Sequence, residues 1–163
     1  MPYLLDADVF ISAWNGPYSF DTVPAFWDWL VAANGSGEVF SVRRIRDELV
    51  AQEDELAVWA RDRDTGFFLP EDDEVISAVR HVATWARDQE RLRPAAVAGF
   101  FNSGELLLIG HALAHGHVVV TQETASPNSE KILKVPDACA GVGVPSVNSY
   151  QMLRDAGARF VLG

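Results

Sequence analysis

The chain begins Met1-Pro2-Tyr3-Leu4-Leu5-Asp6, a short apolar run that ends at an acidic residue. An unbroken apolar run of this length is typical of a buried parallel strand. In α/β proteins, ligands bind in the crevice at the carboxyl ends of such strands. We therefore expect Asp6 to lie at the tip of a central strand, where an ionised carboxylate is costly to bury without a counter-charge. A turn or helix cap is the alternative role for this side chain.

A second apolar run also leads to an acid. The clearest strand of the sequence is Val118-Val119-Val120-Thr121, and it continues through Gln122 to Glu123. Helical patterns fill much of the chain between the two runs. Strands that alternate with helices indicate βαβ units. The sequence therefore predicts an α/β protein with three α/β/α layers and a mainly parallel central sheet.

The other elements follow from apolar spacing and from residues that start or stop helices. We expect helices from a cap at Asp21 or Thr22 to Asn34, from Ser41 through Leu49, from Asp54 to about Arg61, from Glu71 to Arg93, from Ser103 to Gly116 and from Asn148 to Arg154. Extended segments are expected over 131–135, 142–147 and 160–162, with a short helical turn at 136–137.

Two further acids belong to predicted helices. Glu48 flanks the apolar stripe of Ile45 and Leu49, and Glu105 falls in the first turn after Ser103. Each acid alone has an ordinary explanation, since a solvated helix face suits Glu48 and the helix dipole suits Glu105. The stronger observation is that both fall at the same predicted end of the fold as the two strand-end acids.

Four carboxylates that meet at one end of a sheet repel one another unless a cation lies between them. Oxygen-only ligands suit Mg²⁺ or Mn²⁺. Such a cation polarises a phosphoryl group, activates a water and stabilises the leaving oxygen. We therefore predict a metal-dependent hydrolase of phosphate esters. Its metal ligands are Asp6, Glu48, Glu105 and Glu123, and Thr121 joins them as a catalytic residue that orients the water. The pattern leaves open whether Asp8 or Asp137 joins the site.

Composition bounds the class of protein. A chain of 163 residues predicts a single domain over 1–163. It has no apolar run near the roughly 20 residues that cross a membrane and no charged leader, and Cys139 is its one cysteine. These features favour a cytoplasmic protein without a membrane segment. The net charge of −10 argues against binding nucleic acid by bulk electrostatics and suits a basic protein partner.

Basic residues and histidines offer weaker signals. The cluster of Arg43, Arg44 and Arg46 fits either contacts to a phosphate backbone or ion pairs within the chain. His111 and His115 stand four residues apart, a spacing that can hold zinc. Nothing else in the sequence supports a zinc site, so we expect the histidines on the surface.

The quoted segments resemble the PIN-domain family of ribonucleases, which includes the VapC-type toxins of toxin–antitoxin pairs. Residues 4–11 resemble the family's first strand and acid, 41–49 its second-acid helix, 103–114 its third-acid helix, 118–123 its last acidic strand, and 131–137 a segment of one PIN-like subgroup. The resemblance implies an endoribonuclease that uses Mg²⁺ or Mn²⁺, an RNA substrate, an antitoxin that blocks the site, and dimerisation. Two positions depart from the family pattern, because Glu105 follows Gly104 where Asp usually follows Ala, and Glu123 stands where Asp is common.

Two other functions fit parts of the sequence. The pair Asp6 and Asp8 resembles the opening of haloacid dehalogenase phosphatases, in which the first acid is the nucleophile and the second the acid/base. That family expects Gly or Thr soon afterwards, whereas 9–11 is Val-Phe-Ile here. The second alternative is a PIN-like module that binds a partner or RNA without cleaving it, and the departures at Gly104 and Glu105 keep it open.

Overall fold

A computed structural model describes residues 1–162 and places a five-stranded parallel sheet at the centre of the fold. The strands are β1 (Tyr3–Leu5), β2 (Val39–Val42), β3 (Phe68–Leu69), β4 (Val118–Val120) and β5 (Ser146–Val147). Their order in the sheet is β3-β2-β1-β4-β5, and every neighbouring pair is parallel. The predicted α/β fold with a parallel central sheet is confirmed.

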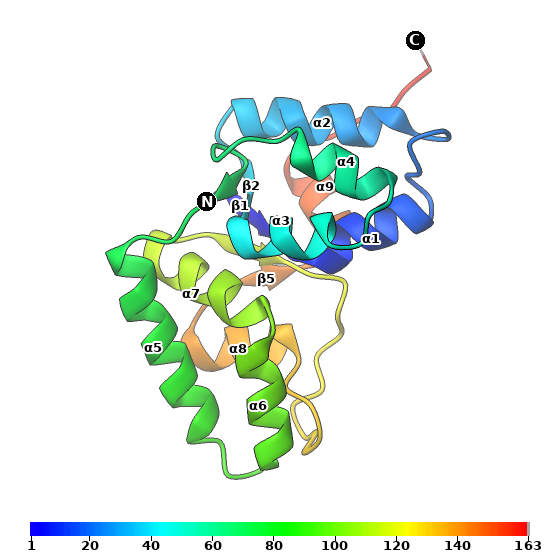
Figure 1. Cartoon of the computed structure of the whole chain (residues 1–163). Helices are drawn as coiled ribbons and strands as arrows, with labels where there is room; N and C mark the ends of the chain where they lie inside the picture. Colours follow the sequence, from blue (N-terminus) through cyan, green and yellow to red (C-terminus); the bar gives the residue numbers. More distant parts are fainter. Residues whose placement is uncertain (163) are drawn as a thin grey trace.

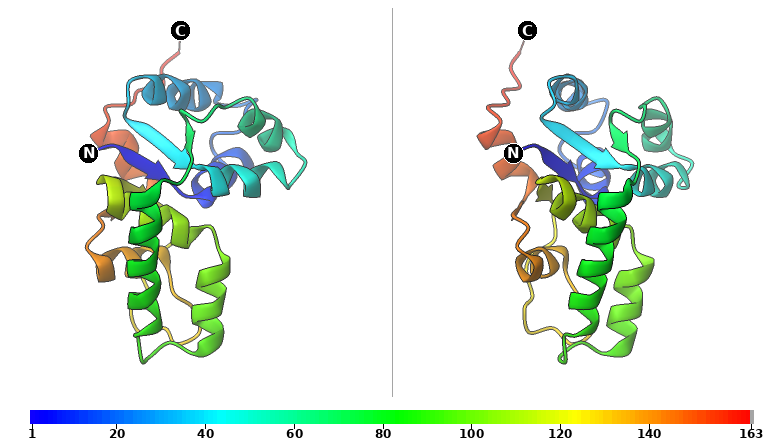
Figure 2. Two further views of the ribbon diagram at one scale, coloured as in Figure 1. Left: turned by 60° about the vertical axis from the view of Figure 1, so that its left-hand side comes forward. Right: turned by 90° about the vertical axis from the view of Figure 1, so that its left-hand side faces the viewer.

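Helices cover both faces of this sheet. They are α1 (Ala7–Asn15), α2 (Pro24–Gly35), α3 (Arg43–Val50), α4 (Glu55–Arg61), α5 (Asp73–Arg87), α6 (Pro94–Asn102), α7 (Glu105–His115), α8 (Val135–Val142) and α9 (Ser149–Asp155). Figure 1 shows α2 on one side of the sheet and α7, with α5 beside it, on the other. The helices α5 and α6 project away from the sheet as an antiparallel pair (Figure 2). The arrangement is a three-layer α/β/α fold.

The direction of the chain across the sheet reverses between β1 and β4. From β1 the chain moves outward to β2 and β3, and it then returns to the other side of β1 to form β4 and β5. Leu5 and Val120, the last residues of β1 and β4, are register partners. Open α/β sheets bind ligands at the carboxyl ends of strands at such a switch point. The residues that follow Leu5 and Val120 therefore occupy the natural ligand site.

The central strands are buried on both faces. Leu4, Leu5, Val119 and Val120 are all 0% exposed. This is why their sequences are continuous apolar runs and do not alternate with polar residues. Burial of each such side chain contributes about 1.5–3 kcal/mol relative to its exposure to water, so the strands that carry the site are held firmly.

Two serines predicted as helix caps have other roles. Ser41 lies inside β2, where its buried Oγ donates a hydrogen bond to the Leu5 carbonyl at 2.7 Å. The following helix begins after Val42 without a side-chain cap. Ser103 ends α6 and donates to the Phe100 carbonyl at 2.8 Å, while Gly104 precedes α7. In each case the hydroxyl donates to a carbonyl oxygen, and the serine side chain does not cap the next helix.

Other boundaries also differ from the sequence prediction. The long helix α5 ends at Arg87, and Pro94 begins a further helix that was not predicted, a position where the fixed φ of proline is favourable. The extended segment predicted over 131–135 leads into the full helix α8, and residues 160–162 form no strand. The cap at Asn148 is confirmed, because its side chain accepts from Gln151 N at 2.9 Å.

No single helix within residues 1–162 is long and apolar enough to cross a membrane. Among these residues, α6 and α7 are long and apolar enough only when they are taken together, and the pair is bent by 71°.

A close approach between α5 and α7 gives the first prediction. A Cβ at Gly110 would lie 3.1 Å from backbone atoms of Val79 and closer still to its side chain, whereas a Cβ at Gly99 in α6 would meet no atom within 4 Å. Gly110→Ala should lower the free energy of unfolding by about 1–3 kcal/mol through overpacking. Gly99→Ala should raise it by up to about 1 kcal/mol, because alanine is the better helix former. Urea denaturation of both variants measures the difference, and an unaltered midpoint for Gly110→Ala would contradict this packing.

Candidate metal centre

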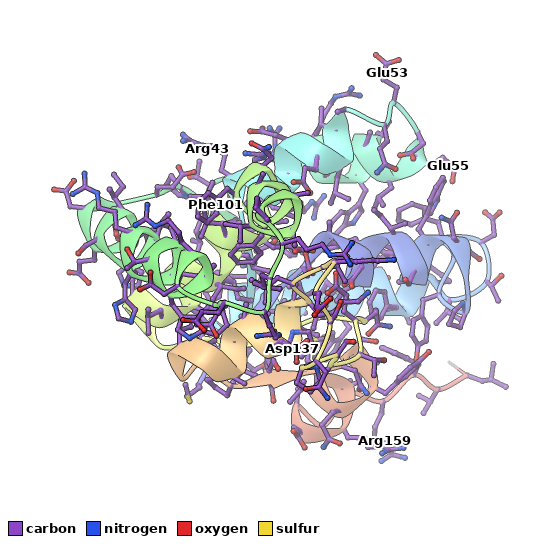
Figure 3. All side chains as sticks on the ribbon, turned by 90° about the horizontal axis from the view of Figure 1, so that it is seen from below. Arg43, Glu53, Glu55, Phe101, Asp137 and Arg159 are labelled. Atoms are coloured by element: carbon purple, nitrogen blue, oxygen red, sulfur yellow. The ribbon has the colours of Figure 1, made fainter. Side chains whose placement is uncertain are left out.

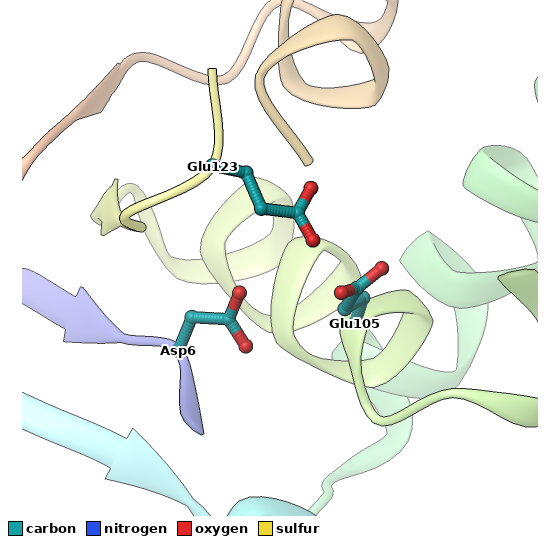
Figure 4. Close-up of side chains that lie close together, drawn as sticks. All are labelled: Asp6, Glu105 and Glu123. Carbon is teal, nitrogen blue, oxygen red and sulfur yellow. The ribbon is translucent and has the colours of Figure 1, made fainter. Parts of the chain in front are cut away.

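Three carboxylates from separate elements meet at the switch point of the sheet. Asp6 follows β1, Glu105 is the first residue of α7, and Glu123 lies three residues after β4. One carboxylate oxygen from each lies within 4.8 Å of the others, a separation that could hold a metal ion. Figure 4 shows the three side chains directed toward a common space. The structure therefore brings together three of the four predicted ligands.

Asp6 both caps a helix and faces this group. Its Oδ1 accepts a hydrogen bond from Ala7 N at 2.8 Å, and its Oδ2 accepts one from Thr121 Oγ1 at 3.3 Å. The backbone N–H of Asp6 donates to the Val120 carbonyl at 2.9 Å, which ties it to β4. Because a carboxylate has about four acceptor sites, these contacts leave capacity for a cation. The two roles considered for Asp6 thus coexist.

The loop after β4 holds Glu123 in place. Glu123 Oε2 accepts a hydrogen bond from Val135 N, the first residue of α8, at 2.8 Å. The positive end of a helix dipole favours a carboxylate there. Asp137, labelled in Figure 3, accepts from Ser126 N at 2.8 Å and fastens the same loop from the start of α8. Asp137 therefore supports the loop and is not one of the three clustered acids.

Thr121 and Asp8 form hydrogen bonds beside the three clustered acids. Thr121 is 2% exposed, and its hydroxyl lies 3.1 Å from Asp8 Oδ2 as well as within reach of Asp6. Both oxygens of Asp8 lie within hydrogen-bond distance of Gln122 N, at 3.1 and 3.0 Å. Asp8 lines the same pocket as Asp6 but lies outside the group of three. These contacts orient the acids and fix the end of β4.

Glu48, the fourth predicted ligand, lies in the wall of the pocket and not in the group of three. The pocket, of about 260 Å³, is lined by Glu48 together with the three acids. Glu48 Oε1 accepts from Gly104 N at 3.0 Å and lies 3.6 Å from Arg44 Nε. A Cβ at Gly104 would lie 2.5 Å from that oxygen. The glycine before Glu105 therefore admits Glu48, which in turn holds the start of α7.

Burial and mutual repulsion raise the pKa values of two of the clustered acids. The pKa of Glu105 rises to about 9, first because of burial and then because of the negative charges of Asp6 and Glu123. The pKa of Asp6 rises to about 7 through burial and then through Asp8. Without a cation the site holds protons near neutral pH. A divalent cation would replace those protons on binding.

The three arginines of the basic cluster on α3 contact acceptor groups of the same chain. Arg43 forms an ion pair with Glu71 at 2.6 Å, and Arg44 donates to the Asn102 carbonyl at 3.0 Å. Arg46 donates to the carbonyls of Ala60 and Arg61 at 3.3 and 3.2 Å. Of the two interpretations offered by the sequence, these contacts favour pairing within the chain.

The prediction that the histidines lie on the surface is wrong for two of them. His111 and His117 are 4% and 6% exposed, and their ring centroids lie 5.4 Å apart. Burial lowers the pKa of His117 to about 4. His115 is partly exposed, and its Nε2 lies 2.7 Å from Asp72 Oδ2. Isolated histidines in a sequence give no signal of burial, and His111 is buried because it lies on the face of α7 that packs against the sheet.

Fold and site together define an α/β protein with a candidate carboxylate metal centre at the switch point of its sheet. The chain belongs to the family described as Domain of unknown function (DUF4411), whose model matches residues 3–160. The matched range includes all three clustered acids. No curated protein and no solved structure matches the chain.

The raised pKa of Glu105 predicts how stability depends on pH in metal-free protein. Its folded pKa of about 9 lies above the ordinary value for Glu, so the folded state retains a proton that the unfolded state loses. Stability must then fall as pH rises. Between about pH 6.5 and 8, after allowance for partial exposure, we expect a loss on the order of 1 kcal/mol per pH unit. Asp6, whose pKa rises to about 7, adds to this loss at the lower end of the window, whereas the buried thiol of Cys139, whose pKa burial raises to about 12, does not.

Urea denaturation in EDTA at several pH values measures this slope. Glu105→Gln should flatten it, and Mn²⁺ should restore stability to the wild-type protein at pH 8 by binding the folded state. Glu55→Gln is the matched control, because Glu55 is also the first residue of a helix but is exposed and lies outside the pocket. A wild-type stability that is flat over this pH range would contradict the clustering of protonated acids.

Glu48 provides a separate test of the site. If Glu48 acts by holding Gly104 N, Glu48→Gln should keep its acceptor oxygen and change Mn²⁺ affinity only a few-fold, whereas Glu48→Ala should weaken it by about 10–100-fold. Calorimetric titration with MnCl₂ measures both. An equal loss in the two variants would show that the charge of Glu48 itself binds the metal.

Proposed function

We propose that this protein is a metal-dependent endoribonuclease whose Mg²⁺ or Mn²⁺ is held by Asp6, Glu105 and Glu123. The observation that carries the proposal is the convergence of these three carboxylates at the switch point of a parallel sheet. Their oxygen-only character suits hard divalent cations. Carboxylates with raised pKa values are also typical of functional sites.

The residues around the group have roles that fit phosphodiester hydrolysis. A bound cation would polarise the phosphoryl group and activate a water. Thr121, buried against Asp6 and Asp8, fixes the orientation of the carboxylates. Glu48 fixes the start of α7 and hence Glu105. Both contribute by preorganising the group, which is a main source of catalytic rate.

The resemblance to PIN-domain ribonucleases extends the proposal to biology. We propose a single PIN-like domain that acts in the cytoplasm as the toxin of a toxin–antitoxin pair and dimerises. The net charge of −10 favours a basic antitoxin partner, because complementary charge speeds association and excludes wrong partners. The family match over residues 3–160 is compatible with one domain.

A specific observation favours a second candidate, a module that binds RNA or protein without cleavage. Glu48 lies outside the group of clustered acids, with its Oε1 against Gly104 N and Arg44, so the group has three carboxylates where the PIN-like pattern has four. The aspartate-nucleophile phosphatase gains no such support, since both oxygens of Asp8 lie against Gln122 N.

Cleavage of RNA by the purified protein tests the proposed function. We expect RNA cutting with Mn²⁺ or Mg²⁺, none with EDTA, and a loss of about 100-fold or more in Asp6→Asn and Glu105→Gln, because each removes a charge from the metal group. The control Glu55→Gln should cut like wild type. Metal binding without cutting would favour the binding module, and equal cutting by wild type and Asp6→Asn would refute the site.

A further inference from the structure

A second pocket adjoins the candidate metal centre. It has a volume of about 340 Å³ and shares Glu105 and Glu123 with the pocket that contains Asp6. It lies between α6 and residues 131–133 of the segment that precedes α8. Arg93 N donates to the Glu130 carbonyl at 2.9 Å, so the segment is tied to the start of α6, and Figures 1 and 2 show the two side by side. A ligand at the metal centre would thus have direct access to this second pocket.

The chemistry of the second pocket differs from that of the first. Its walls are largely apolar, with Ala96 and Phe100 on α6 facing Ile132 and Leu133 on the opposite side. Phe100 and Leu133 are buried, whereas Ile132 is 49% exposed at the edge. Lys131 is the cationic side chain among the lining residues described. The pocket is therefore a small apolar slot with a positive charge in its wall, next to a cluster of acids.

An unstacked nucleobase has the properties that this slot requires. Its faces are apolar, and its sugar connects directly to the phosphates on either side. The volume lies at the lower end of the range of about 300–1,000 Å³ for small-molecule pockets. A base within a duplex is stacked and paired, and it enters such a pocket only after extrusion from the helix.

Resting on the proposed ribonuclease function, we propose that this pocket receives one unstacked nucleobase beside the scissile phosphate, with Lys131 contacting the adjacent phosphate. Because Glu105 and Glu123 line both pockets, a base in the second pocket would bring its neighbouring phosphate next to the acids that would hold the metal. Only RNA with an unpaired nucleotide at this position can therefore bind productively. Gly99, Phe100 and Lys131 become determinants of substrate recognition that are separate from the metal ligands.

Gly99 gives a way to close the pocket without disturbing the fold. It lies within α6 and lines the pocket, and a Cβ there would meet no atom within 4 Å. A larger side chain at this position extends into open space and not into the core. Gly99→Leu should therefore fill the slot, while Gly99→Ala leaves most of it open and serves as the matched control.

Binding and cleavage are measured together for these variants. The probes are a fluorescein-labelled single-stranded RNA of mixed sequence and the same strand annealed to its complement, with Mn²⁺ present for cleavage and the Asp6→Asn background for anisotropy. We expect wild type and Gly99→Ala to bind and cut the single strand in preference to the duplex. Gly99→Leu should bind the single strand about tenfold more weakly or worse, with unchanged Mn²⁺ affinity. Lys131→Gln, an exposed change that leaves the fold intact, should weaken binding about 3–10-fold and reduce its salt dependence.

The outcomes separate this proposal from the proposed function. If wild type cuts RNA and Gly99→Leu cuts and binds it equally well, the pocket proposal is overturned while the nuclease stands. If wild type binds single-stranded RNA and both Gly99→Leu and Lys131→Gln weaken that binding, but nothing is cut, the pocket is supported and the nuclease is not. Equal binding of single strand and duplex by wild type, or no binding of either, overturns the pocket proposal.

Discussion

The repulsion among three carboxylates at the carboxyl ends of β1 and β4 is the constraint on which the site depends. One oxygen of each lies within 4.8 Å of the others in a partly buried space, where burial and then like charges raise the pKa values of Asp6 and Glu105. Such a group persists only because surrounding structure holds it. The register pairing of Leu5 with Val120 fixes two of the chain segments, and the packing of α7 on the sheet fixes the third. Stability of the core is thus used to maintain an arrangement that is unfavourable by itself.

The side chains around the acids explain how that arrangement is maintained without neutralising it. Ala7, Thr121 and Val135 each donate a hydrogen bond to a clustered carboxylate, and all three donors are uncharged. A lysine or arginine in their place would form an ion pair and compete with a cation. Arg44 lies against Glu48, outside the group of three acids. The site therefore combines neutral donors that orient the acids with an unpaired negative charge that only protons or a cation can offset.

The acids at the strand ends are predictable from the sequence because two strong local patterns define those strands. The apolar runs before Asp6 and Glu123 are continuous, and strands with that pattern are central in α/β sheets. The sequence does not decide the role of Ser41, because serine suits both a helix cap and a buried strand hydroxyl, and only the neighbouring Leu5 carbonyl distinguishes the two. Glu48 flanks an apolar stripe at the same predicted end of the fold, which favours a place in the metal group, and its actual partner, Gly104 N, is 56 residues away in the chain. The sequence gives no sign of the pocket beside α6, since Arg93-Pro94 is typical of a helix end, whereas Pro94 begins α6.

The departures from the PIN-like pattern have physical reasons in this structure, namely the length of Glu123 and the absence of a side chain at Gly104. Glu123 stands three residues beyond β4, and its carboxylate both reaches the group and accepts a hydrogen bond from the start of α8. An aspartate there has one methylene fewer and would have to give up one of the two contacts. Glu105 begins α7 after a glycine that lets Glu48 approach the backbone. Any other residue at position 104 would place its Cβ against Glu48 Oε1. The glycine at position 104 and the position of Glu48 therefore depend on each other, because the same backbone N–H that begins α7 holds the Glu48 carboxylate.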